Sequence, residues 1–166
     1  MRQRTLTPAI QQAERLLNAT LPLMGKAPPV NLGVICDWLD IEVYTSSCDA
    51  FGAMFARRDG KDIIMVNDRQ PQGRLRFSVA HELGHVALNH KPLSHILEVR
   101  TPRVEWEADE FAAEILLPEH LLAAERELDA QGRHKRWKLT LPELAKRYRV
   151  SHQALTIRLG EMERAG

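Results

Sequence analysis

The chain has few cysteines, few aromatic residues, almost no net charge and no long uncharged apolar run. Only two of its 166 residues are cysteines, so a disulfide-stabilised scaffold is not expected and the thiols are expected to be reduced. A net charge of +1 indicates no overall attraction to nucleic acid or to an anionic membrane. No apolar run approaches the roughly 18 residues of a membrane helix. Residues 1–8 lack an apolar signal core, and we therefore expect a cytoplasmic protein.

The most informative stretch is His81-Glu82-Leu83-Gly84-His85, inside an apolar pattern that predicts a helix over residues 73–89. On a helix, His81 and His85 lie one turn apart on one face, so both imidazoles can bind the same ion. Glu82 lies about 100° round the helix, where it can act as a base without being a ligand. Such a motif also arises by chance, but unpaired His and Glu side chains are costly to bury in an apolar helix. We therefore predict a zinc site with one position open for hydrolysis.

A second helix is predicted over residues 104–117, and Pro118 stops it. Glu105 and Asp109 are four residues apart on its small-residue face, whereas Glu107 points roughly 200° away from Glu105. We expect Glu105 to be the third zinc ligand, with Glu107 as the reserve. Asp109 is expected to accept a hydrogen bond from the non-ligating nitrogen of a zinc histidine, which would orient that ring.

Other acidic and histidine side chains are expected outside the ligand set. Glu110 and Glu114 are expected on the surface. The metzincin pattern requires a third histidine six residues after the second, and that position is Lys91. His90 is therefore expected to be structural or at the rim of the cleft. Four further histidines have no convergent spacing and are not expected to bind metal: His95, His120, His134 and His152.

Upstream of the zinc motif, the pattern predicts an α+β fold with a zincin-like core. Thr7-Pro8 and Asn31 each open a helix, and an Asp59-Gly60 turn joins two strands. The small sheet, antiparallel or mixed, is predicted from three segments: residues 41–44, 51–57 and 61–67. Residues 51–55 are a candidate edge strand that holds an extended peptide by main-chain hydrogen bonds. An ordinary strand with no substrate role fits the same pattern.

Residues 141–159 resemble a helix-turn-helix, except that Arg149 occupies the turn position usually held by glycine. A helical hairpin that closes the peptidase core is the alternative. We expect a zincin-like metallopeptidase domain over residues 1–130 and a helical subdomain, packed on it, over residues 131–166. The second helix of the pair is expected to expose five side chains to DNA or to a partner: Ser151, His152, Gln153, Thr156 and Arg158.

The run from Arg76 to His85, together with the run from Glu105 to Pro118, resembles the ImmA/IrrE family of zinc metallopeptidases over about residues 30–160. The resemblance implies a gluzincin-like site in which His81, His85 and Glu105 hold zinc and Glu82 is the base. Asp109 departs from the asparagine frequent in the family, and either side chain can orient a histidine. Members cleave repressors of the helix-turn-helix class, and others look like components of toxin–antitoxin pairs.

These observations predict a zinc-dependent endopeptidase that acts on a protein, such as a helix-turn-helix repressor or an antitoxin. Two alternatives remain: a regulatory protein that binds DNA or a repressor, or a toxin–antitoxin component, each with an inactive or structural zinc site. Spacing does not identify the donor that would stabilise the oxyanion beside the metal. Tyr44, His90 and His95 are the candidates.

Overall fold

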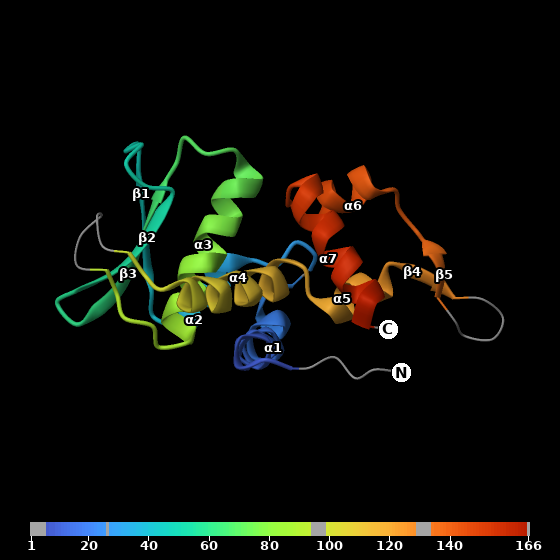
Figure 1. Ribbon diagram of the computed structural model, residues 1–166, viewed down its shortest axis with the longest axis horizontal. Coiled ribbons are helices and arrows are strands. Elements are labelled where there is room, and N and C mark those ends of the chain that lie inside the picture. The colour runs from blue at the N-terminus through green and yellow to red at the C-terminus, as the bar shows by residue number, and fades with distance from the viewer. Residues whose placement is uncertain (1–5, 26, 94–98, 129–133, 166) are drawn as a thin grey trace.

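The structure is a computed structural model that describes residues 6–25, 27–93, 99–128 and 134–165 (Figure 1). Its first half contains helix α1 (Pro8–Thr20), the 3-10 turn η1 (Leu21–Leu23), helix α2 (Leu32–Trp38), strands β1 (Glu42–Ser46), β2 (Ala53–Arg58) and β3 (Lys61–Asn67), and helix α3 (Gln72–Ala87). Its second half contains α4 (Pro102–Leu116), α5 (Glu119–Ala124), β4 (Arg126–Leu128), β5 (His134–Trp137), α6 (Leu141–Tyr148) and α7 (His152–Ala165). The predicted α+β fold is confirmed. No helix among the described residues is long and apolar enough to cross a bilayer.

The first two helices begin where their capping residues predict. The Thr7 hydroxyl accepts a hydrogen bond from the Ile10 N–H at 3.3 Å, and the Asn31 side chain accepts one from the Gly33 N–H at 3.0 Å. Both side chains satisfy a backbone donor that has no partner inside the helix.

The three-stranded sheet is mixed, with the order β1-β3-β2. Strand β3 pairs in parallel with β1 and antiparallel with β2. The β2–β3 turn contains Asp59 and Gly60, with φ values of 51° and 79°, as a two-residue hairpin of the predicted kind requires. Strand β2 begins at Ala53 rather than at Phe51, and it forms one edge of the sheet.

Helices α3 and α4 pack closely, and this contact brings the two predicted zinc segments together. A Cβ atom at Gly84 would lie 3.1 Å from both the Cα and the carbonyl oxygen of Ala108. The absence of a side chain at this position therefore favours the close approach of the two helices. One hydrophobic core, which includes Ile64, Leu83 and Phe111, extends across the sheet and the helices.

The C-terminal helices pack on the same core, and Figure 1 shows them at the opposite end of the molecule from the three-stranded sheet. Thr140 and Glu143 form a capping box at the start of α6, and Arg149 ends that helix in the left-handed region at φ 54°. The turn between α6 and α7 contacts the start of α3, where a Cβ at Gly73 would meet the Ser151 nitrogen at 3.2 Å. The predicted boundary between residues 130 and 131 lies outside the described residues.

Two surface predictions for this region were wrong. Glu114, expected on the surface, is 1% exposed, and Arg158, expected to be available to DNA, is 4% exposed. The Arg158 guanidinium forms an ion pair with the Glu114 carboxylate and donates from Nε to the Leu117 carbonyl at 3.2 Å. The reason is helical spacing: Arg158 shares the inward face of α7 with Leu155 and Leu159, and a paired carboxylate makes its burial tolerable. The β4–β5 hairpin was not predicted.

Candidate metal centre

Three side chains from α3 and α4 converge at the contact between these helices. His81 Nε2 lies 3.0 Å from His85 Nε2 and 3.1 Å from a Glu105 carboxylate oxygen. The second Glu105 oxygen lies 3.4 Å from His85 Nε2. Among the described residues, these three form a group whose donor atoms could hold one metal ion.

The spacing and chemistry of the three donor atoms fit zinc. Tetrahedral zinc with ligands at about 2.1 Å places neighbouring donor atoms about 3.4 Å apart. The two Nε2 atoms are 3.0 Å apart, His81 Nε2 lies 3.1 Å from one Glu105 oxygen, and His85 Nε2 lies 3.4 Å from the other Glu105 oxygen, so each contact is near that edge length. Two imidazoles and one carboxylate form the donor set of a hydrolytic zinc site, and the fourth position is left for water. Zinc therefore fits the residues present.

A carboxylate orients His81. Its Nδ1 donates to the Asp109 carboxylate at 2.8 Å, in the geometry expected from the sequence. The hydrogen bond places the ring proton on Nδ1, so Nε2 presents a lone pair toward His85 and Glu105. Burial alone would lower the pKa of His81, but the Asp109 hydrogen bond and the charges of Glu82, Asp109 and Glu105 outweigh it and raise that pKa.

A chain of hydrogen bonds that the sequence did not indicate orients His85. His90 Nε2 lies 3.1 Å from the Glu107 carboxylate, which only accepts, so this nitrogen carries a proton. In neutral His90, Nδ1 is then an acceptor, and it lies 2.8 Å from Nδ1 of His85. His85 therefore donates from Nδ1 and presents the lone pair of Nε2 toward His81. Arg103 ends this series of hydrogen bonds, since its Nε donates to the Glu107 carboxylate at 2.9 Å.

The two lone pairs therefore face each other across 3.0 Å, an arrangement that a cation between them relieves. His85 itself is fully buried. Burial, followed by the nearby charge of Arg100, lowers the pKa of His85 to about 2. An unprotonated imidazole is the form that binds a metal ion.

Glu82 lies between the sheet and the metal donors. Its carboxylate accepts a hydrogen bond from the Phe55 N–H on β2 at 2.8 Å. Arg100 lies near the same Glu82 oxygen, with Nη1 3.5 Å from it and 3.9 Å from Glu105. Burial raises the pKa of Glu82, although the charges of Arg100 and His81 and the hydrogen bond from Phe55 oppose this rise. A buried carboxylate with a raised pKa, next to an ion site, is suited to proton transfer.

Several predicted residues lie away from the three donors. Glu107, the reserve ligand, bonds His90 and Arg103 instead. Tyr44 is 51% exposed on β1 and donates to Glu42. His95 lies outside the described residues, and His120 is exposed on α5. Four members of the predicted DNA-contact set are exposed on α7 and the turn before it: Ser151, His152, Gln153 and Thr156.

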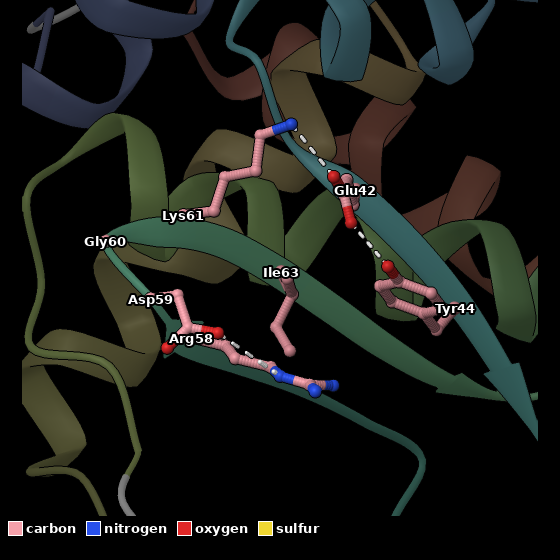
Figure 2. Close-up of a pocket in the computed structure, with 7 residues that line it drawn as sticks. All are labelled: Glu42, Tyr44, Arg58, Asp59, Gly60, Lys61 and Ile63. Atoms are coloured by element: carbon pink, nitrogen blue, oxygen red, sulfur yellow. Dashed lines mark hydrogen bonds and ion pairs between the residues drawn. The ribbon is translucent and has the colours of Figure 1, made fainter.

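A separate hollow lies between β1 and the β2–β3 turn (Figure 2), and none of the three metal donors lines it. Its charged groups are already paired, since Lys61 contacts Glu42 at 2.8 Å and Arg58 contacts Asp59 at 3.7 Å. We therefore place the functional site at the α3–α4 contact rather than in this hollow.

Comparison with known families identifies the family of the chain. The model of the IrrE N-terminal-like domain, Peptidase_M78, matches residues 36–160, which is well over half of the chain. The chain belongs to this peptidase family. Membership supports a function of the metallopeptidase type. The matched range includes the α3 and α4 donors and continues through α6 into α7. A comparison with curated proteins found no match.

Proposed function

We propose that the chain is a cytoplasmic zinc-dependent endopeptidase that cleaves a protein substrate, with His81, His85 and Glu105 as the zinc ligands and Glu82 as the base. The convergence of these three side chains, with contacts of 3.0–3.4 Å between their nitrogen and oxygen atoms, carries the proposal. Membership in a peptidase family and the raised pKa of Glu82 support it. The free thiols of Cys36 and Cys48 suit a reducing compartment.

When bound, zinc would polarise a water molecule and lower its pKa to roughly 7. Glu82 takes the proton from this water as its oxygen attacks the carbonyl carbon of the peptide bond. Glu82 then passes the proton to the nitrogen as the carbon–nitrogen bond breaks. The Phe55 N–H holds one Glu82 oxygen at 2.8 Å, which fixes the carboxylate while it acts.

The edge of β2 is the proposed site for the substrate backbone. The N–H of Phe55 bonds Glu82, and its carbonyl accepts from the Leu93 N–H at 3.0 Å, so both groups point away from β3. Because a strand alternates with period two, the backbone groups of Ala53 point the same way. An extended peptide can pair with β2 at Ala53, and it would then lie beside Glu82.

The proposed substrate is a repressor of the helix-turn-helix class, and an antitoxin is the alternative substrate. The family resemblance supports this choice. The test is incubation of the zinc-loaded chain with the regulatory protein encoded beside it, with and without a chelator. We expect fragments only without chelator, and none with a Glu82→Gln variant that retains zinc. Cleavage by the Glu82→Gln variant at the wild-type rate would contradict the role of Glu82.

A second candidate function is binding of DNA or of a repressor through a C-terminal helical subdomain, proposed as residues 131–166 beside a peptidase domain of residues 1–130. The four exposed side chains around the start of α7 favour it, whereas the burial of Arg158 removes one predicted phosphate contact. A gel-shift measurement over a salt series tests this function, because each phosphate contact steepens the salt dependence of binding. The absence of a sequence-specific shift would exclude direct DNA recognition.

A further inference from the structure

Arg100 is a buried cation whose hydrogen-bonding capacity is not used. Its side chain is only 9% exposed, and it precedes α4 by two residues. Nε and Nη2 are both buried and have no hydrogen-bond partner among the described residues. A guanidinium stays charged in a protein and offers five N–H donors, so an acceptor is expected where it is buried.

The ion pairs that Arg100 forms with Glu82 and Glu105 are longer than hydrogen bonds. Nη1 is 3.5 Å from Glu82 and 3.9 Å from Glu105, whereas a charge-assisted hydrogen bond measures about 2.7–2.9 Å. The guanidinium thus lies beside the base and one metal donor without binding either closely. An oxygen atom that enters between Glu82 and Glu105 would meet the Nη1 donor.

Two other candidates for a donor at this place, Tyr44 and His90, are excluded by their positions, and the third, His95, lies outside the described residues. Tyr44 lies on β1, which β3 separates from the edge strand β2, and its hydroxyl donates to Glu42. His90 uses both ring nitrogens, one toward His85 and one toward Glu107. Among the described residues, Arg100 is the remaining cationic donor beside both Glu82 and Glu105.

We propose that Arg100 is a catalytic residue that donates hydrogen bonds to the carbonyl oxygen of the cleaved peptide bond as negative charge develops on it. The inference rests on the proposed peptidase function. During the attack of water, the carbon–oxygen bond forms, the π electrons move to the carbonyl oxygen and Glu82 receives the proton. Arg100 transfers no proton, and it stabilises the oxyanion more than the neutral carbonyl.

The test uses a probe with a tetrahedral anionic group, so no natural substrate is required. N-phosphoryl-Leu-Ala amide resembles the oxyanion and has a blocked C-terminus, and the same compound with a free carboxylate is the comparison. Binding of both to the zinc-loaded full chain is measured by calorimetry for wild type, Arg100→Gln and Arg100→Lys. Arg58→Gln is the matched control, because Arg58 is 81% exposed on the β2–β3 hairpin. Zinc affinity and unfolding are measured for every variant.

We expect Arg100→Gln to bind zinc as wild type does and to bind the amide probe about 100-fold more weakly, in line with the loss of one oxyanion donor. Arg100→Lys should lose less, because it keeps the charge but not the planar fork. With a cleaved substrate, kcat should fall and KM should change little. Arg58→Gln should match wild type in every measurement.

Three results would overturn the proposal for Arg100 and leave the proposed peptidase function unaffected. They are unchanged binding of the amide probe by Arg100→Gln, loss of zinc from both Arg100 variants, or weakened binding of the free-carboxylate compound only. The last result would assign Arg100 to recognition of a substrate C-terminus. If wild-type protein takes up no zinc, the proposed function fails as well, and the wild-type measurement distinguishes that case from the other three.

Discussion

Removal of the His90 imidazole should weaken zinc binding although His90 is not a proposed ligand. His90 accepts from His85 Nδ1 at 2.8 Å and donates to Glu107 at 3.1 Å, so it holds the ring of His85 in one tautomer and one orientation. Loss of such a partner typically costs 10–100-fold in metal affinity, or about 1.4–2.7 kcal/mol. We expect a loss in this range for His90→Ala, and a smaller loss for His90→Gln, whose amide oxygen can still accept.

Competition with a chromophoric chelator measures the zinc affinity directly. His120→Ala is the control, because His120 is exposed on α5, and it should bind zinc as wild type does. Glu107→Ala should weaken zinc binding less than His90→Ala does. The double variant should bind zinc only slightly more weakly than His90→Ala, because both residues act on His85 through the same series of hydrogen bonds. Unchanged affinity in His90→Ala, or strictly additive losses, would refute this reasoning.

Two predictions concern helix packing, one at the α3–α4 contact and one at the docking of α7. Gly84→Ala places a Cβ 3.1 Å from the Ala108 backbone, so denaturant unfolding should show a loss of about 1–3 kcal/mol, together with weaker zinc binding. Gly160→Ala is the control for this change, because a Cβ at that position meets only the Arg164 side chain, at 3.4 Å, and should stabilise α7. Equal effects of the two substitutions on unfolding would contradict the close approach of α3 and α4. Arg158→Met leaves the buried Glu114 carboxylate without its cation, so urea unfolding should show a loss of about 3–5 kcal/mol. Addition of Glu114→Leu to Arg158→Met should recover most of the lost free energy of unfolding. The control is Arg57→Met, at an exposed ion pair, and it should not change the free energy of unfolding measurably. A neutral Arg158→Met would show that this pair does not dock α7.

Much of the fold could be predicted because local signals agree with the final structure. Thr7 and Asn31 cap the helices they precede, and the Asp59-Gly60 turn joins the two antiparallel strands. Helical periodicity separates Glu105 from Glu107, and the structure places Glu105 beside the two imidazoles and Glu107 beside His90.

What could not be predicted depends on contacts between distant segments. The Arg100 side chain has no spacing relation to the HExxH motif, and only the folded chain brings it to Glu82. The role of His90 requires Glu107 from α4, and a sequence pattern does not show that the two meet. The helix-turn-helix pattern predicts an exposed Arg158, although its spacing from Leu155 and Leu159 indicates the buried face of α7.

The central claim is that one zinc ion is held by His81, His85 and Glu105, and a crystal of the zinc-loaded protein tests it most directly. Anomalous diffraction measured on both sides of the zinc absorption edge locates the ion without assumptions about its ligands. We predict a single strong peak about 2.1 Å from Nε2 of each histidine and from a Glu105 oxygen. A peak at other residues, or no peak at the α3–α4 contact, would contradict the claim.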